Sequence, residues 1–215
     1  MSQASEPDSH VLAALLAGGR NRRYGGHPKA LESVGGELIA ARAIRTLQQA
    51  VGRVVLVAND VDTYRPLGLE IRPDLRPGLG ALGGIHTAVC WAEEAGYRGA
   101  LVAACDMPFL SAELLRELVR DAAGDEVVAP ESGSRRGLEP LCAFYGSGCR
   151  AAIEAALDRG DRHVISFFPD VRVTKIPLEV VMRFGDPETL FLNVNTPEDR
   201  ERAEELLCRT ESEER

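Results

Sequence analysis

Short apolar runs rich in β-branched residues alternate along this chain with segments whose apolar residues have helical spacing. Strands that are apolar on both sides are typical of a sheet covered on both faces, and alternation with helices favours βαβ crossovers and a mainly parallel sheet. The predicted strands are 11–16, 53–58, 70–72, 100–104, 126–129, 140–145, 171–176 and 192–195. The predicted helices are 38–49, 84–95, 111–122, 148–158 and 197–208. We therefore expect an α/β fold.

The length and charge of the chain limit what it can be. Its 215 residues, 45% of them hydrophobic, suit a single globular domain over 11–209 that follows a disordered tail at 1–10. The segment "ESGSRRGLE" (131–139) is the predicted seam between an N-terminal half, about 11–130, and a C-terminal half, about 131–209. The formal net charge of -8 argues against nucleic acid or an anionic membrane as the main partner.

Cysteine usage and the N-terminus indicate the compartment. The five cysteines form no C-x-x-C pair, which is typical of reduced thiols in a cytoplasmic protein. The opening "MSQASEPDSH" has no basic segment leading an apolar one, so it is not interpreted as a signal peptide. The longest apolar run, 11–17, is far below the roughly 20 residues of a membrane-spanning helix. We expect a cytoplasmic protein that does not enter the membrane.

A glycine-rich basic loop follows the first predicted strand. Gly18 and Gly19 allow a sharp turn and close approach to a ligand, at the strand end where open parallel sheets bind ligands. The charges that follow suit phosphate: Arg20, Arg22, Arg23 and Lys29. The spacing matches neither G-x-x-x-x-G-K-[ST] nor G-x-G-x-x-G. A triphosphate cradle and a solvated basic loop are the two interpretations of this segment.

Asp106 comes directly after a second buried strand, in "GALVAACDMPFLS" (99–111). In a parallel sheet it should face the same edge as Gly18. A carboxylate beside a phosphate site repels its ligand unless a cation lies between them, and Mg²⁺ is shared readily between carboxylates and substrate phosphates. The alternative is a turn aspartate that hydrogen-bonds to local backbone.

Two further segments are expected at this edge. The turn "RPDLRPGLGALGGI" (72–85) carries Asp74, and its glycines, Gly83 among them, allow a flat ligand such as a nucleobase or ribose to come close. "NVNTPED" (193–199) supplies Asn193 and Asn195 as neutral donors and acceptors. Helix entry and helix capping are the structural alternatives for the two segments. Among the histidines, only His86 has a neighbour at ligand spacing, Cys90, and this pair is interpreted as packing.

Taken together, these motifs resemble the molybdenum cofactor guanylyltransferases, the MobA-type nucleotidyltransferases. That family has L-A-G-G with an arginine-containing run and a lysine, then G-P-L-[AG]-G, C-D-x-P and N-[IV]-N-T-P-E. This chain has "LAGGRNRRYGGHPKAL", "GALGGI", "CDMPFL" and "NVNTPED" in the same order, with "EPLCAFY" where the family has a Pro-Leu strand on the cofactor side. The resemblance implies a Rossmann-like three-layer sandwich with a mostly parallel sheet, like that of the nucleotide-diphospho-sugar transferases.

The resemblance also implies a reaction: GMP passes from GTP to the phosphate of molybdenum-bound molybdopterin, and pyrophosphate is released. It implies Mg²⁺ as cofactor, GTP and molybdenum-molybdopterin as partners, and transient contact with other cofactor-biosynthesis proteins or apo-molybdoenzymes. The N-terminal half would bind nucleotide and the C-terminal half the acceptor. The implied nucleotide-binding residues are Leu16, Ala17, Gly18, Gly19, Lys29, Asp74, Gly83 and Asp106. The implied catalytic residues are Lys29, Arg23 and Asp106, with Asp106 holding the metal; the implied acceptor-binding residues are Arg162, Asn193 and Asn195.

The chain departs from the family pattern beside the lysine. His27 and Pro28 replace the usual residues there, and "PKAL" is similar to the sister cytidylyltransferases. A cytidylyltransferase or a related small-molecule nucleotidyltransferase is therefore the nearest alternative. A non-catalytic nucleotide-binding adaptor is the alternative from another class, although an adaptor has no need of both Lys29 and Asp106.

Overall fold

The computed structural model describes residues 7–18, 29–120, 122–124, 126–133 and 137–213. Within these ranges it describes the side chains of residues 7–18 and of residues 30–209. Seven strands form one sheet in the order β5-β4-β1-β6-β8-β7-β9. Their bounds are β1 Leu12–Leu16, β4 Val54–Val57, β5 Ile71–Arg72, β6 Gly99–Ala104, β7 Glu126–Pro130, β8 Cys142–Gly146 and β9 Arg172–Ile176. Among them only β8 runs antiparallel to its neighbours, β6 and β7. The prediction of a mainly parallel sheet is confirmed.

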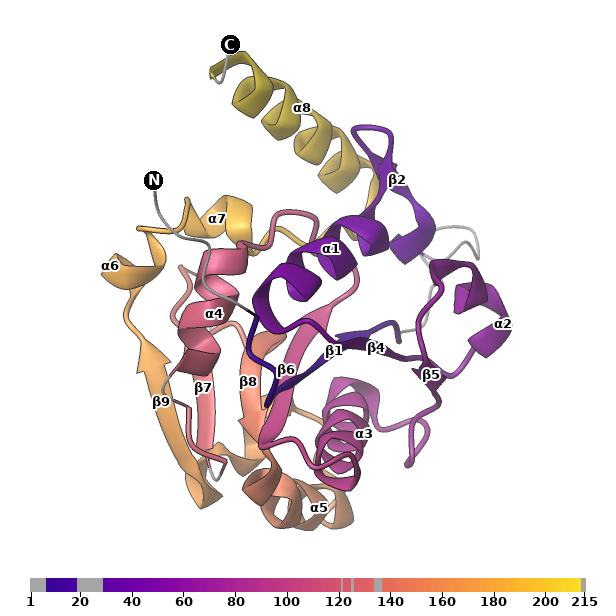
Figure 1. The fold of residues 1–215 in the computed structure, drawn as a ribbon, viewed down its shortest axis with the longest axis vertical. Helices are drawn as coiled ribbons and strands as arrows, with labels where there is room; N and C mark the ends of the chain where they lie inside the picture. Colours follow the sequence, from indigo (N-terminus) through magenta and orange to yellow (C-terminus); the bar gives the residue numbers. More distant parts are fainter. Residues whose placement is uncertain (1–6, 19–28, 121, 125, 134–136, 214–215) are drawn as a thin grey trace.

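Helices cover both faces of the sheet, which makes the three-layer sandwich expected from the resemblance (Figure 1). The longer helices are α1 Ile39–Val51, α3 Gly80–Glu94, α4 Ala112–Arg120, α5 Arg150–Asp158 and α8 Pro197–Glu213. Alternate residues of β1 pack against the helices on opposite faces of the sheet. Ala13 and Leu15 pack with α1 and α4, whereas Leu12 and Ala14 pack with α3 and α5. All four side chains are fully buried, so each residue of this strand contributes to a core.

Several short elements connect this frame. They are the hairpin β2 Ser33–Val34 with β3 Glu37–Leu38, the helices α2 Val61–Tyr64, α6 Leu178–Val181 and α7 Pro187–Leu190, and the 3₁₀ turns Lys29–Leu31, Arg65–Leu67, Ser147–Cys149 and Val164–Asp170. None of them was predicted, because segments of two to seven residues have too few positions to show a period. Within the described residues, no helix has the length and apolar character needed to cross a membrane.

Two predictions are corrected. The segment 192–195 is not a strand: the Val194 N–H donates to the carbonyl of Asp106, which lies in the turn after β6, at 2.9 Å. The Asn195 N–H donates to the Asp199 carboxylate at 2.8 Å and not to a neighbouring strand. The backbone here is therefore bonded to a side chain in the first turn of α8, in place of the strand-to-strand hydrogen bonds of a sheet. The predicted disordered tail 1–10 also ends early, because the Asp8 N–H binds the Ala50 carbonyl at 3.1 Å. Residues 1–6 lie outside the described residues.

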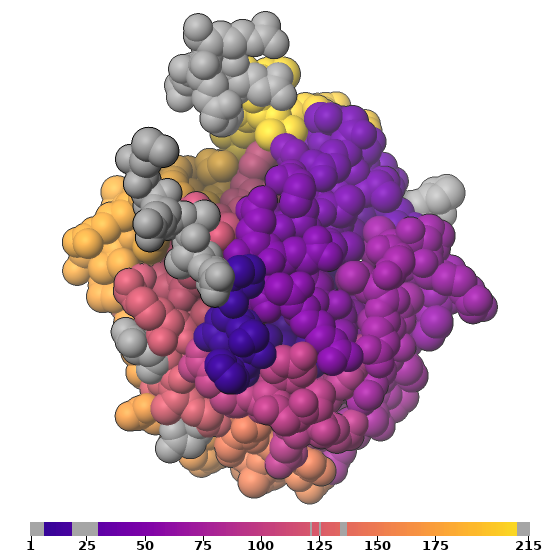
Figure 2. Space-filling model, in the orientation of Figure 1, coloured from indigo at the N-terminus to yellow at the C-terminus, as the bar shows by residue number. Residues whose placement is uncertain are grey.

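The last helix, α8, extends away from the body and packs at its base against the β2–β3 hairpin (Figures 1 and 2). Ala203 is fully buried there, with Leu207 partly buried beside it. The Gly35 N–H donates to the Glu204 carboxylate at 3.0 Å, and a side chain at Gly35 would meet Leu207. The hairpin turn is therefore a glycine for two reasons, its positive φ and this close approach.

Arg98 joins the N-terminus to the sheet and to α4. Its guanidinium donates to the Val119 carbonyl and to the Asp8 carboxylate, both at 2.5 Å, and to the Ala122 carbonyl. It also lies 5.5 Å from the centre of the Phe144 ring. One side chain thus satisfies carbonyls near the end of α4 and fixes the chain that enters β1.

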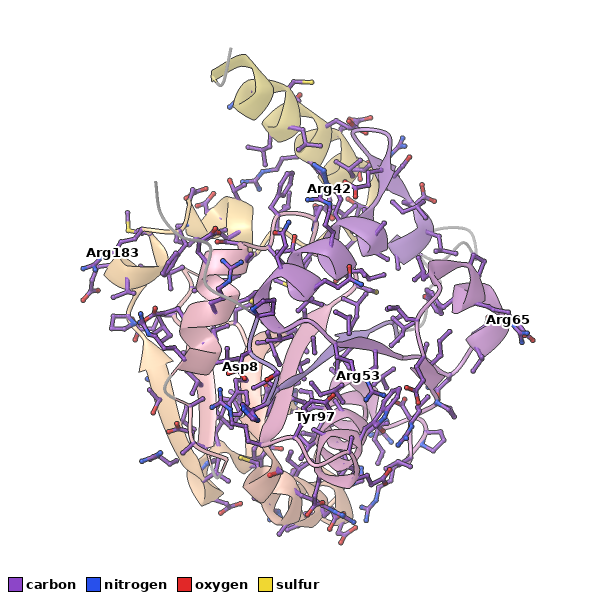
Figure 3. The ribbon with its side chains drawn as sticks, viewed as in Figure 1. Asp8, Arg42, Arg53, Arg65, Tyr97 and Arg183 are labelled. Carbon is purple, nitrogen blue, oxygen red and sulfur yellow. The ribbon has the colours of Figure 1, made fainter. Side chains whose placement is uncertain are left out.

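We expect Arg98→Ala to lower the free energy of unfolding by about 2–3 kcal/mol, because charge-assisted hydrogen bonds and buried carbonyl partners are lost together. Urea unfolding at neutral pH measures this change. The matched control is Arg65→Ala, whose side chain stands at the outer surface in an exposed pair with Asp62 (Figure 3). That substitution should cost less than about 0.5 kcal/mol. Equal losses of unfolding free energy in the two variants would contradict the stabilising role assigned to Arg98.

Candidate active site

Four parallel strands end at one edge of the sheet, and each is followed by a residue that lines a common cavity. Gly18 follows β1, Asn59 follows β4, Asp74 follows β5 and Asp106 follows β6. The cavity has a volume of about 670 Å³. Because parallel strands bring their carboxyl ends together, residues almost 90 positions apart in the chain meet here.

Asp74 is fixed by Asn59. The Asn59 side-chain amide donates to the Asp74 carboxylate at 2.7 Å, and its side-chain oxygen accepts the Asp74 N–H at 3.0 Å. The N-terminal part of α3 closes this side of the cavity, where Gly84 lies against Leu16 and Asp74. A methyl group at Gly84 would contact Leu16 at 3.4 Å and would fill space that is open to the cavity. These two hydrogen bonds between Asn59 and Asp74 hold the Asp74 carboxylate in one orientation.

Asp106 is held through its backbone. The N–H of Cys105 donates to the Leu16 carbonyl at 3.1 Å, which continues the β1–β6 pairing to the residue before Asp106. The Asp106 carbonyl accepts the Val194 N–H at 2.9 Å, and this bond brings Asn193 and Asn195 to the cavity. A carboxylate and two carboxamides therefore meet at the end of β6.

Glu139 and Leu141, which lie just before β8, also line the cavity. Because β8 is antiparallel, its start, not its end, lies at the carboxyl edge of the parallel strands. The Ala104 N–H donates to the Leu141 carbonyl at 2.9 Å, so the pairing of β6 with β8 extends to this edge. Neither Glu139 nor Asn59 was predicted from the sequence as a site residue. The "EPLCAFY" motif pointed to the segment, but strand direction could not be read from it.

The structure brings together half of the residues predicted for the site. Those that line the cavity are Leu16, Gly18, Asp74, Asp106, Asn193 and Asn195. Others do not line it: Ala17 is buried, Gly83 lies one residue before Gly84 within α3, and Arg162 is exposed. Lys29 begins a 3₁₀ turn, and its side chain is not described. Gly19 and Arg23 lie outside the described residues.

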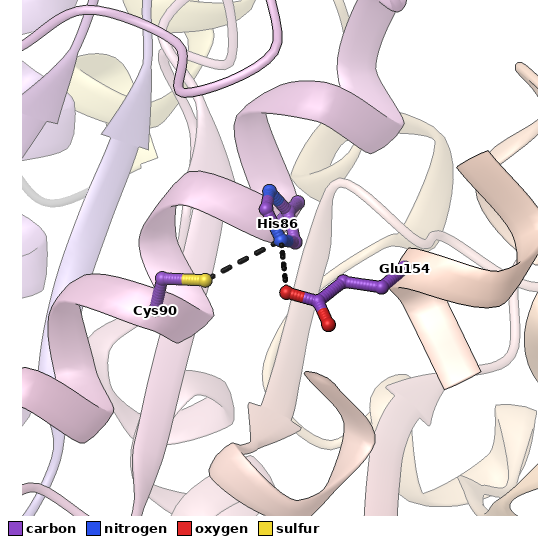
Figure 4. A group of neighbouring side chains, drawn as sticks. All are labelled: His86, Cys90 and Glu154. Carbon is purple, nitrogen blue, oxygen red and sulfur yellow. Dashed lines mark hydrogen bonds and ion pairs between the residues drawn. The ribbon is translucent and has the colours of Figure 1, made fainter. Parts of the chain in front are cut away.

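A second cluster of polar groups lies apart from the cavity, between α3 and α5 (Figure 4). The His86 Nε2 atom is 3.1 Å from a Glu154 oxygen and 3.4 Å from the Cys90 sulfur. Arg150 donates to the same Glu154 oxygen at 2.9 Å. The bonds from His86 and Arg150 lower the pKa of Glu154, and burial raises the pKa of the Cys90 thiol. These contacts join two helices, and the adjacent guanidinium disfavours a metal cation, so a packing role accounts for them.

The sheet order and the cavity at its carboxyl edge define an α/β nucleotidyltransferase with the nucleotide-diphospho-sugar transferase fold. The family model of the MobA-like NTP transferase domain matches residues 13–173, and this chain belongs to that family of enzymes.

Curated relatives and solved structures agree with this assignment. A probable molybdenum cofactor guanylyltransferase of Pelotomaculum thermopropionicum is 40% identical over 88% of this chain and 89% of its own length. The molybdenum cofactor guanylyltransferase of Desulfosudis oleivorans is 34% identical over 92% of this chain and 96% of its own. The crystal structure of molybdopterin-guanine dinucleotide biosynthesis protein A from Archaeoglobus fulgidus superposes with a TM-score of 0.75, at 28% identity, over 92% of this chain and 99% of that one.

The role of the hydrogen bonds between Asn59 and Asp74 can be tested by measuring nucleotide affinity. We expect Asn59→Ala to weaken nucleotide binding about tenfold, because Asp74 loses two bonds that hold it at the cavity wall. Equilibrium titration with the preferred nucleoside triphosphate measures this. Asn59 is exposed, so the melting temperature should change little. An unchanged affinity in a folded Asn59→Ala protein would show that the orientation of Asp74 does not matter for binding.

Proposed function

We propose that this chain transfers GMP from GTP to the phosphate of molybdenum-bound molybdopterin, forming molybdopterin guanine dinucleotide and releasing pyrophosphate. One observation carries the proposal: Gly18, Asp74 and Asp106, from three separate strand ends, line one cavity. The names of the relatives support the substrates. GTP, molybdenum-molybdopterin and a cytoplasmic setting are parts of this proposal, as is transient contact with other proteins of cofactor biosynthesis or with apo-molybdoenzymes.

The donor set at the end of β6 fits Mg²⁺. The described side chains there offer oxygen atoms, from the carboxylate of Asp106 and from the carboxamides of Asn193 and Asn195. Oxygen is the ligand atom that Mg²⁺ prefers, and one or two carboxylates together with substrate phosphates are its usual partners. Asp106 would hold the ion. When bound, Mg²⁺ would offset negative charge on the phosphate oxygens.

The residues of the chain would act mainly by positioning. Gly18 follows β1, where the backbone can come close to phosphate, and its sequence neighbours Gly19, Leu16 and Ala17 are further nucleotide-binding residues of our proposal. Asp74, oriented by Asn59, would contact the nucleoside, with Gly83 in the helix turn beside it. Lys29 and Arg23 would offset charge on the α-phosphate and on the departing pyrophosphate.

The reaction needs no general base in this scheme. The attacking group is a phosphate oxygen, which is already ionised at neutral pH, and it displaces pyrophosphate in line at the α-phosphorus. One P–O bond forms and one breaks, and the enzyme lowers the barrier by alignment and charge neutralisation. The acceptor would lie toward Asn193 and Asn195, with Arg162 as a further contact to its phosphate.

The choice of base can be read from a binding panel. With Mg²⁺ present, we expect GTP to raise the melting temperature more than CTP, ATP or UTP at equal concentration. A ligand at 100 times its dissociation constant adds about 2.7 kcal/mol of stability. Differential scanning fluorimetry measures the shifts, and magnesium alone is the control. A larger shift with CTP would replace the proposed guanylyltransferase by a cytidylyltransferase.

The role of Asp106 can be tested by turnover. We expect Asp106→Ala to lower the rate of GMP transfer on the order of 10²-fold or more, because charge on the phosphates is no longer offset. Pyrophosphate release with GTP, Mg²⁺ and molybdenum-molybdopterin measures the rate. The control is Asp62→Ala, which removes an exposed carboxylate of α2. Full activity of Asp106→Ala would remove the metal role, and GTP binding without pyrophosphate release by the wild type would favour an adaptor.

A further inference from the structure

Thr87 is a polar residue in the buried middle of α3. Its side chain is 1% exposed, and the residue does not line the cavity. A hydroxyl that leaves water costs free energy unless it finds hydrogen-bond partners in the fold. The partners of this hydroxyl therefore show what it contributes.

The Thr87 hydroxyl is bonded both within its own helix and outside it. It donates to the Gly83 carbonyl, one turn earlier in α3, at 3.0 Å. A bond of this kind is common for threonine in helices and by itself indicates no function. The hydroxyl oxygen also accepts the Leu75 N–H at 2.9 Å, from a residue 12 positions away. Because the single hydroxyl proton is used on Gly83, the oxygen is left to accept the Leu75 N–H.

Leu75 belongs to the Asp74 loop, residues 73–79, which connects β5 to α3. This loop lies against the first turns of the helix. A methyl group at Gly83 would be 3.1 Å from the Arg76 carbonyl oxygen, and one at Gly84 would be 3.7 Å from an Asp74 carboxylate oxygen. Positions 83, 84 and 87 share one side of a helix. This side of α3 therefore determines where the Asp74 loop lies relative to the cavity.

The backbone of the Asp74 loop is held from two directions. The Asp74 N–H donates to the Asn59 side chain, beyond β4, at 3.0 Å, and the next N–H, that of Leu75, donates to Thr87 on α3. Arg76 forms an ion pair with α5 at 2.6 Å, but a largely exposed pair of this kind adds little stability. Loss of the Thr87 hydroxyl would therefore remove the buried hydrogen bond that joins this loop to α3.

We propose that Thr87 is a positioning residue for nucleotide binding: its hydroxyl holds the Asp74 loop on α3, and so places the Asp74 carboxylate for the nucleoside. This inference rests on the proposed function, in which Asp74 contacts the nucleoside. Asp74 lies away from the bonds that form and break in that reaction. Loss of its placement should weaken the ground state and the transition state alike, which raises KM and leaves kcat unchanged.

Two substitutions separate the hydroxyl of Thr87 from its methyl group. Thr87→Val keeps the branched shape and removes the hydroxyl, whereas Thr87→Ser keeps the hydroxyl and removes the methyl group. We expect Thr87→Val to raise KM for GTP about tenfold, the effect of one lost hydrogen bond, with kcat within about twofold of the wild type. Thr87→Ser should keep both constants within about twofold. Initial rates of pyrophosphate release with Mg²⁺ and saturating molybdenum-molybdopterin measure them.

The matched control is Val89→Ala, in the same helix. Val89 is fully buried, and two positions along a helix place it on a different side from Thr87. This substitution should lower the melting temperature and leave KM for GTP unchanged. An unchanged KM in a folded Thr87→Val protein would overturn the inference. So would an equal rise of KM in Thr87→Ser or in Val89→Ala, since packing or stability would then account for it.

Amide hydrogen exchange in the ligand-free protein tests the contact without any reaction. We expect the Leu75 amide to exchange at least about tenfold faster in Thr87→Val than in the wild type, and Thr87→Ser to keep the wild-type protection. An unprotected Leu75 amide in the wild type would overturn the inference, because the proposed anchor would not hold the loop.

Failure of the proposed function gives a different result. If the wild type binds GTP but releases no pyrophosphate with the acceptor, the transferase reaction is refuted. The dissociation constant for GTP with Mg²⁺, from equilibrium titration, then replaces KM in the comparison of Thr87→Val with Thr87→Ser. If the wild type does not bind GTP, both the proposed function and the role of Thr87 are refuted.

Discussion

Hydrogen bonding on both sides of β1 is the constraint on which the rest of the molecule depends. β1 pairs in parallel with β4 on one side and with β6 on the other, and its side chains are buried toward both helical layers. Such a strand has no position left for a polar side chain, because each residue is committed to a core. Groups that bind or react with a ligand can therefore lie only beyond the end of the strand. The cavity accordingly starts at Leu16 and Gly18, the last strand residue and the turn beyond it.

The same constraint explains why the site is assembled from single residues of distant segments. Each strand end contributes one or two polar groups to the site. Backbone hydrogen bonds connect these ends: the N–H groups of Cys105, Ala104 and Val194 donate to the carbonyls of Leu16, Leu141 and Asp106, respectively. Strand register brings these segments to one edge of the sheet, whereas the orientation of the Asp74 carboxylate depends on its side-chain bonds with Asn59. The side of the cavity near α3 is closed by the start of that helix, where Gly84 lies against Leu16 and Asp74.

Much of the fold followed from sequence because its long elements have strong patterns. The core strands and the five main helices appear within a few residues of the predicted bounds, except that α3 begins at Gly80 and α8 continues to Glu213. The segment 192–195 was mistaken for a strand because its apolar alternation is real, whereas its pairing is decided by the Asp199 cap. Glu139 and Asn59 could not be found as site residues, since their places depend on strand direction and strand order. Neither property is encoded in local periodicity.

The bridge between Glu131 and Leu138 closes the β7–β8 hairpin just before Glu139. The Ser132 N–H then bonds to the Gly137 carbonyl at 3.2 Å, so the turn beyond this point is anchored at both of its ends. A change in the length of that turn would leave the spacing of Glu139 from β8 untouched. The positions of Glu139 and Leu141 at the cavity are therefore set by backbone pairing of the flanking strands and are independent of the length of the turn.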